Sequence, residues 1–99
     1  MAIRIDPEHK ETHALKGLYP NLAGKSVLEI GSGDGRLTWR FAARAARVVA
    51  IEPDEGKHAA ALASRPGGFE HVEFLNLGLD AYAPQSKERF DVVILSWSL

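Results

Sequence analysis

The chain contains no cysteine, a single methionine and few aromatic residues, which make up 8% of its 99 residues. The absence of cysteine excludes a disulfide, a thiolate metal site and a cysteine nucleophile within this sequence. An excess of charge of one sign is also absent, because the formal net charge is −1. This balance gives no reason to expect nucleic acid or an anionic membrane as a partner.

Long hydrophobic runs are missing as well. No apolar segment approaches the roughly 20 residues that a membrane-spanning helix needs. Residues 1–6 have neither the apolar core nor the cleavage site of a signal peptide. We therefore expect a cytoplasmic protein with no membrane partner. A length of 99 residues, with 45% hydrophobic and 25% charged residues, predicts one small globular domain.

Apolar segments alternate with helical patterns along the chain, which predicts an open parallel α/β sheet. The connection over residues 76–89 shows no strong helical period and contains Pro84. The pattern divides the chain into a helix with its lead-in, residues 1–24, and an α/β unit, residues 25–99. We expect strands at residues 26–30, 47–51, 71–75 and 90–97, and helices at about residues 6–18, 35–46 and 53–63.

The most informative stretch is residues 27–35, in which an apolar strand runs into a loop with glycine at every second position. Gly31, Gly33 and Gly35 suit such a loop because glycine adopts positive φ and lets a ligand approach the backbone. The helix that follows directs its first amides and the positive end of its dipole into the same gap. The loop is therefore a candidate ligand-binding turn.

Two acidic residues accompany this loop. Glu29 lies inside the apolar strand, two positions before Gly31, and its carboxylate needs hydrogen bonds there. The loop amides or the ammonium of a ligand are the nearby candidates. Glu52 ends the next strand, where its oxygens can accept hydrogen bonds from a ribose diol. Strand, glycine turn, helix, strand and acid together form a βαβ unit suited to a nucleoside.

The spacing of the glycines distinguishes between nucleoside ligands. A dinucleotide fingerprint, Gly-x-Gly-x-x-Gly, needs a glycine where this chain has Arg36. Glu29 together with the glycine loop instead resembles the first motif of the class I S-adenosylmethionine-dependent methyltransferases. Glu52 resembles the second motif of that family. Residues 90–99 are similar to the family's fourth strand in members that act on small molecules, so the resemblance covers nearly the whole chain. No Asp-Pro-Pro-Tyr-type motif follows, which argues against adenine in DNA as the acceptor.

The resemblance implies a three-layer, Rossmann-like α/β fold with an open parallel sheet. The family has seven strands in the order 3-2-1-4-5-7-6, and this sequence supplies the first four, in the partial order 3-2-1-4. The chain would then be the cofactor-binding half of a longer enzyme, truncated after the fourth strand. It would use S-adenosylmethionine and a small-molecule acceptor, without nucleic acid. The fourth strand would form an exposed edge through which two copies could pair as a homodimer.

The resemblance also implies which residues bind the cofactor. The glycine loop would hold the amino-acid end and the sugar, and Glu52 the ribose hydroxyls. Gly78 stands where the family usually has an acid for the adenine amino group, so Asp80 or the backbone of Leu79 would read adenine. Ser96 would bond the cofactor or only end its strand. The candidate residues are Glu29, Gly31, Ser32, Gly33, Asp34, Gly35, Glu52, Pro53, Leu79, Asp80 and Ser96.

Three functions remain open at this point: a methyltransferase, a non-catalytic cofactor-binding or assembly module, and a nicotinamide-dependent dehydrogenase half-domain, which Arg36 disfavours. No general base is identified in the sequence. His9 and His13 stand four apart but lack a third metal ligand, so we assign no metal site and interpret them as part of a solvated helix. Arginines 36, 40, 44 and 47 are likewise interpreted as a solvated face and not as a nucleic-acid contact.

Overall fold

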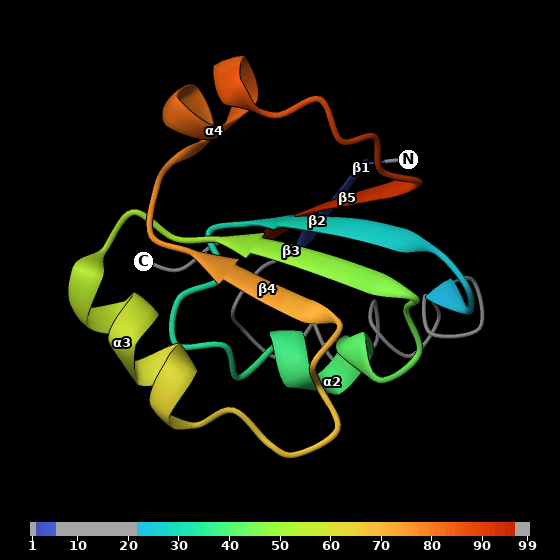
Figure 1. Ribbon diagram of the computed structural model, residues 1–99, viewed down its shortest axis with the longest axis horizontal. Coiled ribbons are helices and arrows are strands. Elements are labelled where there is room, and N and C mark those ends of the chain that lie inside the picture. Colours follow the sequence, from blue (N-terminus) through green and yellow to red (C-terminus); the bar gives the residue numbers. More distant parts are fainter. Residues whose placement is uncertain (1, 6–21, 97–99) are drawn as a thin grey trace.

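The computed structural model describes residues 2–5 and 22–96. These residues form a parallel five-stranded sheet with three helices (Figure 1). The strands are β1 (Ala2–Ile5), β2 (Ser26–Ile30), β3 (Arg47–Ile51), β4 (Val72–Leu75) and β5 (Val92–Ser96). The helices are α2 (Thr38–Ala42), α3 (Glu55–Ala63) and α4 (Leu79–Gln85). The helix expected at residues 6–18, with its two histidines, lies outside the described residues.

The order of the strands is β1-β5-β2-β3-β4. The segment β4-β3-β2-β5 is the order expected from the sequence, so this prediction is confirmed. Each of its neighbouring pairs is parallel, with Val27 beside Val48 and Leu28 beside Val93. Parallel pairing brings the carboxyl ends of β2, β3 and β5 to one edge of the sheet, which is where the glycine loop and Glu52 begin.

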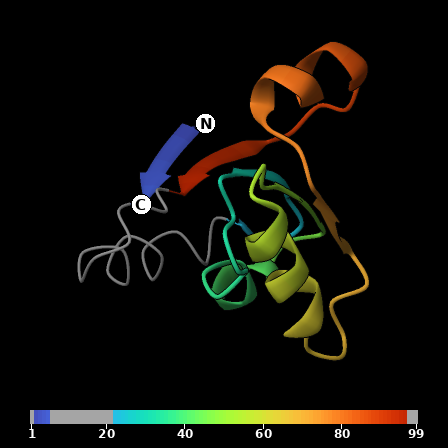
Figure 2. The ribbon, with the colours of Figure 1, turned by 90° about the vertical axis from the view of Figure 1, so that its left-hand side faces the viewer.

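Helices cover both faces of the sheet, which gives the expected three-layer arrangement. In Figures 1 and 2, α2 and α3 lie on one face and α4 lies on the other. The larger hydrophobic cluster lies under α2 and α3, where Leu37, Phe41 and Ala45 are buried as their helical spacing predicts. Alternate strand residues complete this cluster: Val27, Val48, Ala50, Val72, Phe74, Val92 and Ile94.

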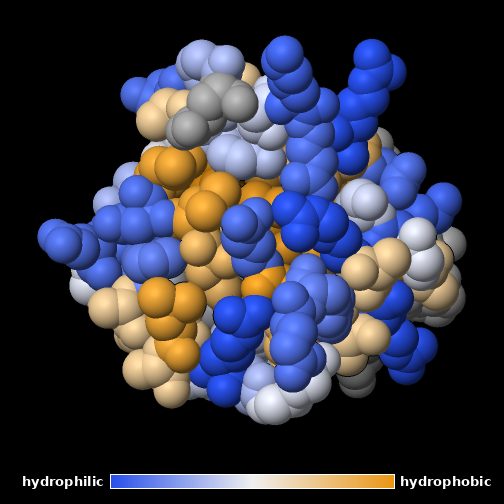
Figure 3. Space-filling model, in the orientation of Figure 1, coloured by the Kyte–Doolittle hydropathy of each residue, from blue (hydrophilic) through white to orange (hydrophobic). Residues whose placement is uncertain are grey.

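The face under α4 is less completely covered. Tyr82 is the buried residue of α4, and it packs with Leu28, Val49 and Ile51. Partly buried side chains continue this cluster toward solvent, namely Ile30, Leu75, Leu77, Phe90 and Val93. Figure 3 shows the hydrophobic surface that results between α4 and the strands. A cavity of about 210 Å³ lies on this face, lined by Leu28, Tyr82 and Phe90 among others.

The outer side of β5 is occupied, contrary to the expectation of an exposed edge. β1 pairs with β5 in parallel over its whole length, with Ala2 beside Val93 and Ile5 beside Ser96. The prediction that the fourth strand forms the edge of the sheet is therefore wrong, because a segment from the start of the chain satisfies the outer amides and carbonyls of β5. The homodimer expected through this edge loses its structural basis for the same reason.

Two helices differ from the sequence prediction. The helix expected at residues 35–46 is reduced to α2, because Gly35 takes a positive φ of 86° before it and short turns follow it. In these turns Arg44 and Ala45 donate to the carbonyls three residues earlier, Phe41 and Ala42. The other difference is α4, which forms in the connection where no helix was expected and contains Pro84.

Ion pairs account for part of the predicted basic face. Arg47 forms a forked pair with Glu88, at 2.6 and 3.0 Å, and a further contact of 3.2 Å with Glu73. The hydrogen bonds from Arg47 lower the pKa of Glu88. This pair ties the connection after α4 to the start of β3.

None of the helices in the described residues has the length and apolar character that crossing a bilayer requires.

Candidate functional site

The glycine loop, residues 31–35, leads from β2 toward α2. Gly31, Gly33 and Gly35 have φ values of 79°, 61° and 86°. This is the left-handed region that favours glycine, as expected from the sequence. The loop is anchored on β3, because the amides of Gly31 and Ser32 donate to the carbonyl of Ile51 at 2.9 and 3.1 Å. The carboxyl end of β3 thus fixes where the loop begins.

Close packing also constrains two of these glycines. A Cβ on Gly31 would stand 2.6 Å from the carbonyl oxygen of Ser96, at the end of β5. A Cβ on Gly35 would stand 3.2 Å from both Ala61 on α3 and Trp39 on α2. The loop therefore passes closer to β5 at Gly31 than a residue with a side chain would allow, whereas a side chain at position 35 would require Ala61 or Trp39 to shift by a few tenths of an ångström.

Glu52 lies against the glycine loop at the end of β3. Its Oε1 accepts the amide of Gly33 at 2.7 Å and its Oε2 accepts the amide of Asp54 at 2.9 Å. The residue is buried, with 4% of its surface exposed. Asn76, which follows β4, donates to the carbonyls of Glu52 and Pro53 at 2.9 and 3.2 Å. The prediction that Glu52 and the loop share one edge of the sheet is confirmed.

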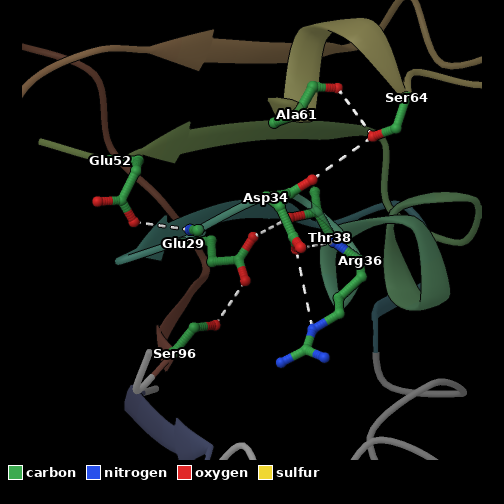
Figure 4. Close-up of polar contacts among 9 residues, drawn as sticks. Glu29, Asp34, Arg36, Thr38, Glu52, Ala61, Ser64 and Ser96 are labelled. Carbon is green, nitrogen blue, oxygen red and sulfur yellow. Dashed lines mark hydrogen bonds and ion pairs between the residues drawn. The ribbon is translucent and has the colours of Figure 1, made fainter. Parts of the chain in front are cut away.

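Glu29 is fully buried below the loop, and Figure 4 shows its carboxylate between Thr38 and Ser96. Thr38 Oγ1 donates to Oε1 and Ser96 Oγ donates to Oε2. The loop-amide alternative is wrong for the described residues, because this carboxylate is bonded by the hydroxyls of α2 and β5 while the amides of Gly31 and Ser32 donate to the carbonyl of Ile51. Burial raises the pKa of Glu29 to about 7; the two hydroxyl bonds oppose this rise and the charge of Glu52 adds to it.

The other residues predicted for the site lie around Glu29 and Glu52, and several of them are exposed. Asp34 is exposed at the outer turn of the loop, where its carboxylate accepts the amide of Arg36 at 3.2 Å and pairs with its guanidinium at 3.8 Å. Leu79 and Asp80 form the exposed first turn of α4. A Cβ on Gly78 would stand 3.0 Å from Asp80 and 3.8 Å from Pro53. The start of α4 therefore lies beside the segment that follows Glu52.

Sequence reasoning missed two residues of the site, Thr38 and Asn76. Thr38 lies next to Leu37 on the buried face of α2, and a polar side chain on an otherwise apolar face was the signal for a buried partner. Asn76 follows β4 directly, at the same edge of the sheet as Glu52. Its side-chain amide fixes the backbone that carries Glu52. A polar residue directly after a parallel strand was the signal in the sequence for this role.

The hydrogen-bonding groups of this site suit a nucleoside ligand. Each oxygen of Glu52 accepts one amide, and a carboxylate offers about four lone-pair positions, so acceptor capacity remains for a diol. Gly31, Gly33 and Gly35 carry no Cβ, so a ligand can approach the backbone closely at these three positions. Within the described residues, no cluster of three or more side chains could hold a metal ion. The chemistry available here is hydrogen bonding and charge, suited to holding an organic cofactor.

Known proteins resemble this chain in sequence. A family model described as "Methyltransferase domain" matches residues 27–99. The "Ubiquinone biosynthesis O-methyltransferase" of Pseudomonas fluorescens strain Pf0-1 is 38% identical over 73 residues, which are 74% of this chain and 32% of that protein. The protein of the same name from Pseudomonas putida strain GB-1 is 34% identical over 95 residues, 89% of this chain and 41% of that protein. The chain thus spans well under half the length of these relatives.

Solved structures share the fold. An S-adenosylmethionine-dependent methyltransferase from Mesorhizobium loti superimposes with a TM-score of 0.72 at 23% identity, over 95% of this chain and 42% of that one. Arabidopsis thaliana protein arginine methyltransferase 10 superimposes with a TM-score of 0.75 at 25% identity, over 91% of this chain and 27% of that one. Together with the family match over residues 27–99, these findings show that the chain belongs to the class I S-adenosylmethionine-dependent methyltransferases.

Proposed function

We propose that this chain binds S-adenosylmethionine for a methyltransferase that modifies a hydroxyl group of a small molecule. The observation that carries the proposal is the 2.7 Å hydrogen bond between Gly33 of the loop and Glu52 at the end of β3. It brings together, at one sheet edge, a backbone that a ligand can approach closely and a carboxylate that can accept a sugar diol. The donor-binding role follows from this pairing.

The residues of this chain would bind and orient the donor. When bound, S-adenosylmethionine supplies a methyl group activated by the positive charge of its sulfonium. Glu52 would accept the ribose hydroxyls, while the glycine backbone of the loop would lie against the amino-acid end of the donor. Leu79 and Asp80, beside Pro53, would face the adenine edge. Methyl transfer depends mainly on placing donor and nucleophile in line, so a rigid donor site makes a direct contribution to rate.

The acceptor class is supported by the names of the relatives. Both Pseudomonas proteins are called ubiquinone biosynthesis O-methyltransferases, and O-methylation requires a hydroxyl acceptor. Because the chain spans 32% and 41% of these two proteins, the residues that select the acceptor are proposed to lie outside the matched part. We therefore place no general base among the residues described.

Isothermal titration calorimetry tests the donor-binding proposal. We expect saturable binding of S-adenosylmethionine and none of NAD by the unmodified chain. Glu52→Ala should abolish or strongly weaken that binding. Glu55→Ala is the matched control, since it removes an exposed carboxylate from the nearby first turn of α3 and should leave binding unchanged. Binding of NAD in preference to S-adenosylmethionine would overturn the proposal.

Methyl transfer is tested separately, with a radiolabelled methyl donor and a catechol as the hydroxylated acceptor. The chain is compared with a longer form that extends past Leu99 to the length of the relatives. Transfer by the longer form and donor binding by both would support the proposal. Donor binding by both without transfer by either would favour a non-catalytic cofactor-binding module.

A further inference from the structure

β1 ends at the same edge of the sheet as the glycine loop. It pairs with β5 in parallel, from Ala2 beside Val93 to Ile5 beside Ser96. Figure 2 shows the two strands side by side and pointing in the same direction. Parallel pairing brings the last residues of two neighbouring strands to one edge of a sheet. A strand from the start of the chain therefore reaches the edge that carries the candidate donor site.

The last residue of β5, Ser96, has its sheet partner in β1 and not in β2. The register between β2 and β5 ends with Ile30 beside Leu95. Ser96 lies one residue beyond this register, and there Ile5 of β1 pairs with it. Among the described strands, Ile5 is thus the register partner that places the backbone of Ser96.

Ser96 meets the surroundings of the glycine loop through two groups. A Cβ on Gly31 would stand 2.6 Å from the carbonyl oxygen of Ser96, so the loop passes directly against the end of β5. The hydroxyl of Ser96 donates to Oε2 of Glu29, which lies below the loop (Figure 4). A displacement of Ser96 would therefore disturb both the loop and the buried carboxylate beneath it.

The pairing of β1 can open while the centre of the sheet stays folded. β1 is a strand of 4 residues at one edge of the sheet. It pairs with β5 alone among the described strands, whereas β2 and β3 each pair with two neighbours. A short edge strand opens at a lower free energy than the central strands. The contact that places Ser96 is thus made by one of the less stable parts of the sheet.

We propose that β1 positions the donor site, with Ile5 as a positioning residue that acts through Ser96 on the glycine loop. The proposal rests on the proposed donor-binding function and extends it to the first residues of the chain. When β1 is paired, Ser96 is fixed and its carbonyl supports the loop at Gly31. When β1 separates, Ser96 loses its register partner, and the loop loses the surface against which it lies.

Thermodynamic linkage makes this effect reciprocal. If the pairing of β1 raises donor affinity by some factor, donor binding stabilises that pairing by the same factor. Couplings between two sites of one protein span about 5- to 150-fold. We expect a factor of about tenfold, toward the lower end of this range, because the coupling passes through the single residue Ser96.

Amide hydrogen exchange of the unmodified chain, followed by NMR with and without saturating S-adenosylmethionine, is the primary experiment. In the free chain, the β1 amides that bond to β5 should exchange faster than those of β3, through local opening of the edge. The donor should slow these β1 amides by about tenfold. If β1 exchanges no faster than β3, or if the donor leaves its exchange unchanged, the proposal is overturned.

Two pairs of substitutions at the same positions give the complementary test. Ile3→Gly with Ile5→Gly keeps the length of the chain and disfavours a strand. It should lower the affinity for S-adenosylmethionine in calorimetry by about tenfold. Ile3→Val with Ile5→Val keeps β-branched residues and should bind as the unmodified chain does. If the glycine pair does not fold, the exchange measurement on the unmodified chain decides.

Gly24→Ala is the control for a general loss of stability. Gly24 precedes β2 at the opposite edge of the sheet and has a φ of +73°, so alanine there is strained without touching the donor site. Its donor affinity should equal that of the unmodified chain. A loss of affinity as large as that of the glycine pair would show that affinity follows stability alone, and would overturn the role of β1.

The outcomes separate this proposal from the proposed function. Equal donor affinity of the glycine pair and the unmodified chain would overturn the role of β1 and leave donor binding intact. Failure of the unmodified chain to bind S-adenosylmethionine would overturn donor binding, and the role of β1 with it.

Discussion

Replacing Gly31 with alanine tests whether the loop is shaped by backbone conformation alone or also by contact with β5. Gly31 has a φ of +79°, and an added Cβ would stand 2.6 Å from the carbonyl oxygen of Ser96. Two other glycines separate these contributions. Gly24 has a φ of +73° with nothing within 4 Å of an added Cβ, and Gly67 has neither a positive φ nor a neighbour within 4 Å.

The structure gives each substitution its own expected cost. For Gly67→Ala the folded state loses nothing and the unfolded chain loses freedom, so the variant should be stabilised by about 0.4–1 kcal/mol. Gly24→Ala adds a left-handed alanine, which costs about 1–2 kcal/mol. Gly31→Ala adds the same strain and displaces the backbone of β5, at a further cost of about 1–3 kcal/mol. We therefore expect Gly31→Ala to lose about 2–5 kcal/mol.

Urea denaturation followed by circular dichroism measures the free energy of unfolding of the three variants. The expected order of stability is Gly67→Ala, then Gly24→Ala, then Gly31→Ala. Donor affinity should fall for Gly31→Ala, because β5 and the loop must separate, and should stay unchanged for the other two. If Gly31→Ala is no less stable than Gly24→Ala, the close approach of the loop to β5 is refuted.

Three further predictions concern charged residues. Glu52→Ala should weaken S-adenosylmethionine binding by about 1.5–3 kcal/mol, because charge-assisted bonds to a diol are lost. An unchanged affinity in the titration would show that Glu52 does not belong to the site. Arg47→Ala should cost less than about 1 kcal/mol in urea denaturation, since its side chain is 42% exposed, despite the fork to Glu88. Because burial raises the pKa of Glu29 from 4.5 to about 7, the folded state holds a proton that the unfolded chain releases. The free energy of unfolding should therefore fall from pH 5 to pH 8, by up to about 3 kcal/mol, and Glu29→Gln should lack this slope.

The sequence predicted the centre of the fold because its signals there are local. Strands β2, β3 and β5 are mostly apolar segments, and glycine at every second position after β2 predicts a tight ligand-binding turn. Parallel pairing then places the ends of these strands together, so the neighbourhood of the loop and Glu52 followed without coordinates. What could be predicted was which backbone segments meet.

Pairing that depends on distant or weak signals could not be predicted. β1 is a strand of 4 residues whose partner, β5, lies at the other end of the sequence, and nothing local marks that pairing. Among the α4 residues whose burial the structure describes, Tyr82 alone is buried, so this helix lacks the apolar stripe by which a helix is recognised. The start of α2 depended on Gly35, whose positive φ delays the helix until after Leu37.

The partners of Glu29 show why side-chain contacts are harder to predict than sheet order. In β2, Glu29 points to the face covered by α2, and Ile30 points to the face of α4. A shift of one residue in register would exchange these faces and place the carboxylate under α4. The hydroxyls of Thr38 and Ser96 meet Glu29 only because α2 begins where it does and β5 keeps Ile94 beside Glu29. Strand register thus places the buried carboxylate of Glu29, and the glycines set the conformation of the loop. The first depends on how distant segments pair, which is why the contacts of Glu29 could not be predicted from the sequence while the shape of the loop could.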